Sequence, residues 1–243
     1  MKPSPSLAVL TIAFAACCFE TGCKKSSDSG GSTDPGAPTG AAAQWGSAVD
    51  PLGDSTIKHA DGVLAITVPG GIHDMSGVRT ENNRTAPRML QEVEGDFTVT
   101  VKVTCDFDPP SKRNGNAFNG AGILVFASDD NFLRLERNVW TTPVGMKVNY
   151  APLFEYWLDN EMRSTERGTP EPFFKGNSTF LRLTRKGDQV TASVSHDGLD
   201  WEETNSALTE LPKRVKVGVS VVNTAAKPLK VEFSEFQLVR GSR

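Results

Sequence analysis

The amino-acid sequence predicts an all-β fold, an antiparallel sandwich of two sheets. Apolar and polar residues alternate along residues 97–105, which is the period of two of a strand with one buried face. Turn-forming residues recur at short intervals, for example at 186–188 and at 197–198. No segment shows a competing helical period, and strands joined by tight turns without helical crossovers are typical of sandwiches.

Ten segments carry strand patterns. Residues 122–127 are apolar on both faces, which predicts a central strand covered on both sides. In the last segment, Val231 and Phe233 have one parity while Phe236 and Leu238 have the other, so a β-bulge is expected near Ser234. The predicted strands are 63–68, 88–93, 97–107, 122–127, 132–138, 146–158, 179–185, 189–195, 215–222 and 230–239.

Three parts are expected along the 243 residues. Residues 1–23 begin with Lys2 and continue into an apolar run that is too short for a membrane span, which predicts an export signal. Residues 24–43 are rich in Ser, Gly, Pro and Asp and cannot bury enough apolar surface to fold, so they are expected to form a flexible linker. Residues 44–243 are long enough for one large β-sandwich domain.

The end of the export signal resembles the processing site of bacterial lipoproteins. Cys23 follows Thr21 and Gly22, the small-residue-then-cysteine pattern in which the cysteine is lipidated and becomes the mature N-terminus. Glu20 fits this pattern poorly, and Cys17 is the alternative site. The expected location is the cell envelope, on the periplasmic or outer surface, with the membrane contacted only through the lipid anchor.

Composition and charge exclude several classes of partner and site. The net charge is −3 with acids and bases interspersed, so nucleic acid is not an expected partner. Cys105 is the only cysteine beyond the signal region, so no disulfide within the domain is expected, and its place on the apolar face of a strand predicts a buried, inert thiol. The three histidines are scattered, which gives no zinc site. A monomer is expected.

The order of the strand segments resembles a known superfamily. The segments "GDFTVTVKV", "GAGILVF", "FLRLTRKGDQVTASVSHDGLDWE" and "VKVGVSVV" follow one another as in the concanavalin A-like lectin/glucanase superfamily, and within it as in the domain-of-unknown-function family 1349. The resemblance covers residues 45–239. It implies a jelly-roll sandwich whose concave sheet face often binds sugars.

A candidate ligand site lies in residues 146–163, where aromatic and acidic side chains concentrate. In an extended strand Glu155 and Trp157 share one face, and aromatic rings stack on sugars while carboxylates and amides bind hydroxyls. The alternative is that Tyr156 and Trp157 belong to the core or to a sheet edge. The expected ligand-binding residues are Arg134, Glu136, Trp140, Asn149, Glu155 and Trp157.

Catalysis is not favoured by the sequence. Glu136, Glu155 and Glu161 are the candidate acids for glycoside hydrolysis, which needs two carboxylates at a set separation. Their spacing differs from the Glu-x-Asp-x-(x)-Glu pattern that the resemblance to glucanases implies. Trp201, at the end of the S-x-D-G-x-x-W motif, is expected to anchor a hairpin and to bind no ligand.

Calcium is the one possible cofactor. Asp106, Asp108, Asp129 and Asp130 lie in expected loops, where carboxylate oxygens could converge on the ion. Turn-forming aspartates are the simpler explanation. The sequence as a whole predicts an exported, membrane-tethered binding module with carbohydrate as its ligand class. The alternatives are a glycoside-active hydrolase and a structural or protein-binding component of the envelope.

Overall fold

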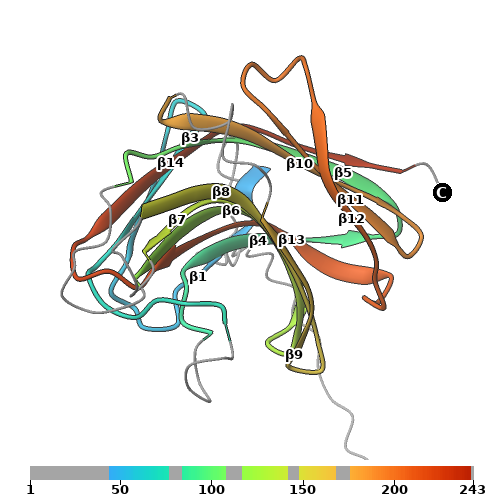
Figure 1. Ribbon diagram of the computed structural model, residues 1–243, viewed down its shortest axis with the longest axis horizontal. Helices are drawn as coiled ribbons and strands as arrows, with labels where there is room; N and C mark the ends of the chain where they lie inside the picture. Colours follow the sequence, from blue (N-terminus) through green and yellow to red (C-terminus); the bar gives the residue numbers. More distant parts are fainter. Residues whose placement is uncertain (1–43, 77–83, 108–116, 142–147, 168–175, 242–243) are drawn as a thin grey trace, which may run out of the picture. The chain divides into compact units, whose positions relative to one another are not determined.

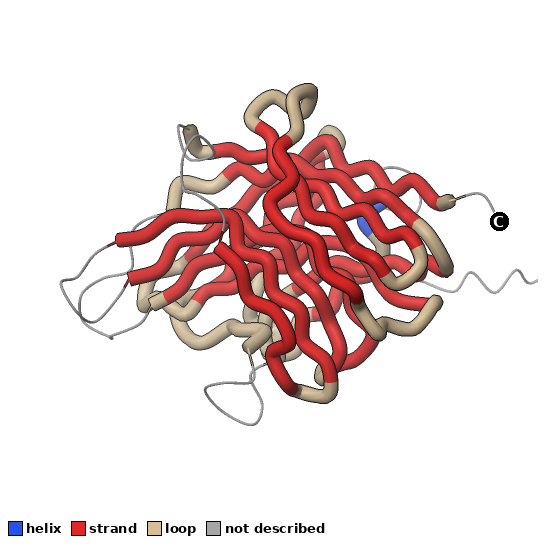
Figure 2. Tube along the Cα trace, turned by 45° about the vertical axis from the view of Figure 1, so that its right-hand side comes forward, coloured by secondary structure: helices blue, strands red, loops and turns tan. Residues whose placement is uncertain are grey.

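The computed structural model describes residues 44–76, 84–107, 117–141, 148–167 and 176–241, and these form the predicted antiparallel β-sandwich (Figures 1 and 2). Each of its two sheets has seven strands in the described part of the chain. Sheet A has the order β1 (Ser47–Val49), β4 (Arg88–Glu94), β13 (Arg214–Asn223), β6 (Phe118–Ser128), β7 (Asn131–Thr141), β8 (Val148–Leu158) and β9 (Glu161–Arg167). Sheet B has the order β12 (Glu202–Leu208), β11 (Gln189–Ser195), β10 (Ser178–Lys186), β5 (Phe97–Thr104), β14 (Leu229–Arg240), β3 (Val63–Val68) and β2 (Thr56–Ala60).

The core lies between the two sheets and is built from alternate residues of their strands. In β5 buried and half-buried residues alternate without a break, and Val99, Val101 and Val103 all face the core. Strand β6 is the central strand expected, since most of its residues are buried on both faces. Trp45 extends the core at one end, where its ring lies 4.9 Å from that of Phe236.

All ten predicted strands are present, and the expected bulge is confirmed. The register of β14 against β5 shifts between Ser234 and Gln237, and Glu235 has a positive φ of 52°. The bulge allows apolar residues of both parities in β14 to reach the same core. Gly198 has a φ of 79°, as the turn of its hairpin requires.

Four strands were not predicted, and each of them is the outermost strand of a sheet. They are β1, β2, β9 and β12. Four of the five residues of β2 are exposed, and the sequences of β9 and β12 are dominated by charged and hydroxyl side chains. An edge strand of this kind has no alternating apolar face, so the period of two does not reveal it.

Some predictions concern residues outside this structure. The export signal 1–23, the linker 24–43, both lipidation candidates Cys23 and Cys17, and the calcium candidate Asp108 lie outside the described residues. Along the described ranges there is no helix that could cross a membrane.

Candidate functional site on the outer face of sheet A

The outer face of sheet A, the one that points away from sheet B, carries most of the candidate ligand-binding residues. In β7, Leu133 and Leu135 belong to the core between the sheets, so Arg134 and Glu136 point to the outer face. Figure 1 shows β7 and β8 bending away from sheet B toward the β8–β9 hairpin, and the outer face lies on the inside of this bend. The expected sugar-binding face therefore corresponds to this surface.

Arg134 joins two acids of this face, Glu136 on its own strand β7 and Glu155 on the neighbouring strand β8. Its Nε and Nη2 donate to Glu155 Oε2 at 2.9 and 2.7 Å, and its Nη1 donates to Glu136 Oε1 at 3.2 Å. Trp157 Nε1 donates to the same Oε2 of Glu155 at 3.2 Å. The structure thus brings together four of the six candidate ligand-binding residues.

Burial controls the charges of this cluster. Glu136 is fully buried, and burial raises its pKa to about 7 although the Arg134 guanidinium acts in the opposite direction. Burial would lower the pKa of Arg134, but the carboxylates of Glu136 and Glu155 outweigh that effect and raise it. Arg134 therefore stays charged, while Glu136 exchanges its proton near neutral pH.

Trp157 is on the outer face but is not open to a ligand. Its ring stacks on that of Phe132, with centroids 5.8 Å apart and an interplanar angle of 13°. The Arg84 guanidinium lies over both rings, 5.0 Å from the Phe132 centroid and 5.5 Å from the Trp157 centroid. Only 2% of Trp157 is exposed, so a sugar ring cannot stack on it in this arrangement. Tyr156 belongs to the core, as one of the interpretations expected.

A second aromatic pair lies at the other end of the outer face and is partly exposed. Phe118 in β6 is the cross-strand partner of Trp140 in β7, and Trp140 is in turn the partner of Asn149 in β8. All three side chains are half-buried. Phe118 lies before the predicted strand 122–127, although its parity with Gly120 and Gly122 places it on this face. Two rings beside an amide form a surface suited to stacking and hydrogen bonding with a sugar.

Between the two aromatic groups, polar atoms are buried without partners. Within the described residues, Glu136 Oε2, Ser220 Oγ and both side-chain atoms of Asn138 have no hydrogen-bond partner. The three residues are 0% exposed. Buried polar atoms are usually hydrogen bonded, so an unpaired group of them points to a bound water or ligand.

The segment around Asp74 covers part of this face. Met75 and Ala86 pack on Leu124 and Val222, which lie on the outer side of β6 and β13. Asp74 orders this cover, since its backbone oxygen accepts from Thr85 and Ala86 and its carboxylate accepts from Met75 and Ser76. Nothing in the local sequence indicates this cover, because it comes from a loop far from β6 and β13 in the chain.

The candidate catalytic acids do not form an open pair. Glu136 and Glu155 are both bonded to Arg134 and are 0% and 8% exposed. Glu161 is the register partner of Leu158, whose side chain packs against the core, so it lies on the opposite face of the sheet from Glu155. Its exposed carboxylate pairs with Arg163 at 3.1 Å.

The calcium candidates are separated as well. Asp129 and Asp130 are exposed in the β6–β7 turn, and Asp129 lies 3.8 Å from a guanidinium nitrogen of Arg88. Asp106 is exposed at the other end of the sandwich, beyond β5. Across the described ranges, no three His, Cys, Asp or Glu side chains come close enough to hold a metal ion.

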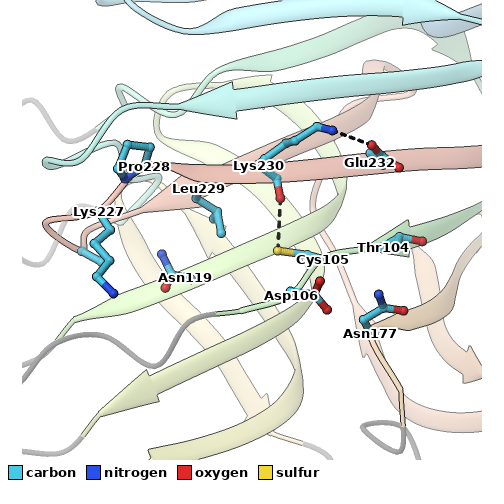
Figure 3. A pocket seen from close by; sticks show the side chains of 11 residues that line it. Thr104, Cys105, Asp106, Asn119, Asn177, Lys227, Pro228, Leu229, Lys230 and Glu232 are labelled. Atoms are coloured by element: carbon cyan, nitrogen blue, oxygen red, sulfur yellow. Dashed lines mark hydrogen bonds and ion pairs between the residues drawn. The ribbon is translucent and has the colours of Figure 1, made fainter.

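A pocket of about 340 Å³ opens at the end of the sandwich, between β5, β6 and the start of β14 (Figure 3). Cys105 is one of the residues that line it, and its thiol donates to the Lys230 carbonyl at 3.4 Å. Cys105 is 4% exposed, which confirms the prediction that it is buried, and burial raises the pKa of its thiol to about 12. The residues lining the pocket are Thr104, Cys105, Asp106, Asn119, Asn177, Ala225, Lys227, Pro228, Leu229, Lys230 and Glu232.

Trp201 has the structural surroundings expected of it. Its Nε1 donates to the Gly198 carbonyl at 3.0 Å, and the Arg182 guanidinium covers its ring at 3.6 Å from the centroid. Both contacts hold the hairpin that joins β11 to β12. Trp201 precedes β12 in the connection from β11, and both strands belong to sheet B, whereas the candidate ligand-binding residues lie on sheet A.

Comparison with known proteins identifies the fold. No family model matches the chain, and no curated protein matches its sequence. Its structure is similar to that of a functionally unknown protein from Saccharomyces cerevisiae, with a TM-score of 0.67 and 15% identity over 82% of this chain and 98% of that chain. It is also similar to the GH43 BlXynB protein from Bacillus licheniformis, with a TM-score of 0.52 and 12% identity over 79% of this chain and only 36% of that chain. At these identities the likeness is one of fold, and the chain is a jelly-roll β-sandwich.

Proposed function

We propose that this protein is a carbohydrate-binding module of the cell envelope. The observation that carries the proposal is the half-buried pair of Phe118 and Trp140 on the outer face of sheet A, with Asn149 beside it. Aromatic rings give sugars a flat apolar contact, and neighbouring amides and carboxylates bind their hydroxyls. The rings lie on a rigid sheet, so little conformational entropy is lost when a ligand binds.

Two further considerations support a role with carbohydrate. A GH43 protein contains the same fold over part of its length, which is compatible with such a role at the level of the fold. The resemblance to the concanavalin A-like lectin/glucanase superfamily, which rests on the order of the strand segments, implies a concave sheet face that often binds sugars. The ion pairs of Arg134 with Glu136 and Glu155 favour binding over hydrolysis, because both acids are buried and the guanidinium holds one oxygen of each.

The location is part of the proposal. Residues 1–23 act as the export signal, Cys23 carries the lipid, and residues 24–43 form the tether. A flexible tether of this length lets the sandwich search for polysaccharide near the membrane that holds it.

A glycan array tests the proposal. The purified full chain is expected to bind a limited set of glycans, and Trp140→Ala is expected to lose that binding by at least tenfold while the protein stays folded. Trp201→Ala is the matched control, because Trp201 lies in the connection between β11 and β12 of sheet B and should not affect binding. If no glycan on the array or in a polysaccharide pull-down binds the wild-type chain, the protein is not a carbohydrate-binding module.

A further inference from the structure

The unpaired polar atoms of the outer face lie around two glycines. Glu136, Asn138 and Ser220 are each fully buried, and each has an atom without a hydrogen-bond partner among the described residues. Gly120 is the cross-strand partner of Asn138, and Gly122 pairs with Glu136 on one side and with Ser220 on the other. The three polar side chains therefore surround positions at which the sheet has no side chain.

The carboxylate of Glu136 reaches over Gly120. A Cβ atom at Gly120 would lie 2.4 Å from Glu136 Oε2 and 2.8 Å from Cε1 of the Phe118 ring. Since Asn138 is directly across from Gly120, the unpaired oxygen of Glu136 and the unpaired amide of Asn138 are neighbours on the same face. Phe118, whose ring lies beside Gly120, is half-buried, so it marks the side of this group that is nearest to solvent.

The chemistry of these atoms specifies the group that fits. Asn138 Oδ1 needs a donor and Asn138 Nδ2 needs an acceptor, while an ionised Glu136 Oε2 needs a donor. A hydroxyl group donates one hydrogen bond and accepts two, so it serves as both donor and acceptor. An aliphatic group would leave all of these atoms unpaired, so the free-energy cost of burying them without hydrogen bonds would remain after binding.

The charges of the face favour a neutral ligand. Its buried arginines are Arg88 and Arg134, and its buried acids are Asp74, Glu136 and Glu155. With the half-buried Arg84, which also lies on this face, the arginines equal the acids in number, and Arg134 is already bonded to two of the acids. No surplus of buried positive charge is left on this face to bind a carboxylate or sulfate group.

We propose that Glu136, Asn138 and Ser220 form a subsite for a hydroxyl group of a neutral sugar, and that they set the specificity of the outer face. The inference rests on the proposed carbohydrate-binding function and adds the class of sugar. The sugar ring lies against Phe118 and Trp140, and one of its hydroxyls enters the subsite beside Phe118. These three residues gain partners only when the ligand is bound.

The test compares affinity with stability in the same variants. Asn138→Leu and Ser220→Ala remove unpaired polar atoms, so each is expected to keep or raise the melting temperature of the full chain and to weaken binding of the best neutral glycan by at least tenfold. Asn205→Leu is the matched control, because Asn205 is a buried asparagine with an unpaired Nδ2 on sheet B. It should not change binding.

The outcomes separate this inference from the function on which it rests. If the wild-type chain binds no glycan, the proposed function fails. If it binds glycans and both Asn138→Leu and Ser220→Ala bind as tightly as wild type, carbohydrate binding stands and the subsite is wrong. If both variants lower the melting temperature by several degrees, the polar atoms are satisfied within the protein by water, and the subsite is again wrong. Tighter binding of uronate or sulfated glycans than of neutral ones overturns the neutral class.

Discussion

Arg84 covers the ring of Trp157, with the guanidinium carbon 5.5 Å from the ring centroid. The same guanidinium lies over Phe132 and donates from Nη2 to Asn160 Oδ1 at 2.8 Å, so it joins the loop before β4 to the β8–β9 hairpin. The most buried tryptophan of the outer face is therefore protected from solvent by a residue that the strand pattern gives no reason to select.

Replacing Arg84 with alanine should expose this tryptophan. In Arg84→Ala, acrylamide quenching of Trp157 fluorescence is expected to increase and stability to fall by about 1 kcal/mol, the size of a cation–π contact. Both measurements are repeated with Trp157→Phe, in the presence and absence of Arg84→Ala, so that the fluorescence of the other tryptophans can be subtracted. Arg163→Ala serves as a control, since Arg163 is exposed and pairs only with Glu161 among the contacts described. Equal quenching in Arg84→Ala and wild type would contradict the contact.

Substitution of Trp157 should mainly lower stability, whereas substitution of Trp140 should mainly weaken glycan binding. Trp157→Ala removes a ring that is 2% exposed and is expected to cost about 3–5 kcal/mol in urea unfolding. Trp140 is half-buried, so Trp140→Ala should cost less than Trp157→Ala and have the larger effect on glycan affinity. If Trp157→Ala proved as stable as Trp140→Ala, the packing described for Trp157 would be incorrect.

Glu136 should make stability decrease as pH rises toward neutrality. Its pKa in the folded protein, about 7, lies above the ordinary value of 4.5, so the folded state binds the proton more tightly than the unfolded state. The stabilisation is fully present below pH 4.5 and is lost as pH rises through 7, by up to about 3 kcal/mol.

Glu136→Gln is neutral at every pH and isolates this contribution. Urea unfolding of wild type and Glu136→Gln between pH 4 and 8 should show a difference in stability that changes across this window and is constant above it. Other carboxylates titrate in both proteins and cancel in the comparison. A difference that does not vary with pH would mean that Glu136 has the same pKa in the folded and unfolded chains.

Gly120 should not tolerate a side chain. A Cβ atom there would lie 2.4 Å from Glu136 Oε2 and 2.8 Å from Phe118 Cε1, so Gly120→Ala is expected to cost about 1–3 kcal/mol and to displace the carboxylate. Gly176→Ala is the matched control, because nothing lies within 4 Å of the added carbon. Differential scanning calorimetry of both variants measures the difference in melting temperature. Equal melting temperatures would mean that the Glu136 carboxylate does not lie over Gly120.

Cys23 is expected to carry the lipid anchor. In an expression host that processes lipoproteins, wild type should label with radioactive palmitate and partition into detergent, and Cys23→Ser should do neither. Cys17→Ser is the control and should behave as wild type. Loss of labelling in Cys17→Ser with retention in Cys23→Ser would move the cleavage site to the alternative cysteine.

The strands of the core could be predicted from sequence because burial on one face imposes a period of two. In β5 the pattern from Phe97 to Val103 is the same in the sequence and in the structure. The same parity placed Arg134, Glu136, Glu155 and Trp157 on one face. The four edge strands could not be predicted in this way. Strand β1 has only three residues, and β2, β9 and β12 are mostly polar, so none of them shows an alternation of apolar and polar residues.

The rest of the candidate site depends on contacts between distant parts of the chain. Arg84 and Asp74 lie in a loop, and nothing in the local sequence indicates that this loop covers the outer face. Burial of Trp157 follows from that cover, so the strand pattern alone could not distinguish an exposed ring from a packed one. Phe118 was accessible to prediction by parity, but the predicted strand began at residue 122 and left it out.

The polar edge strands also affect how one copy of the protein meets another. The outer edge of a sheet offers unpaired backbone groups, and aggregation begins when two such edges pair. Here β2 presents Lys58 and His59, β9 presents Glu161 and Arg163, and β12 presents Glu202 and Glu203. Pairing would bring these charged and polar side chains together and strip them of water, so the sandwich is suited to remain dispersed at high local concentration.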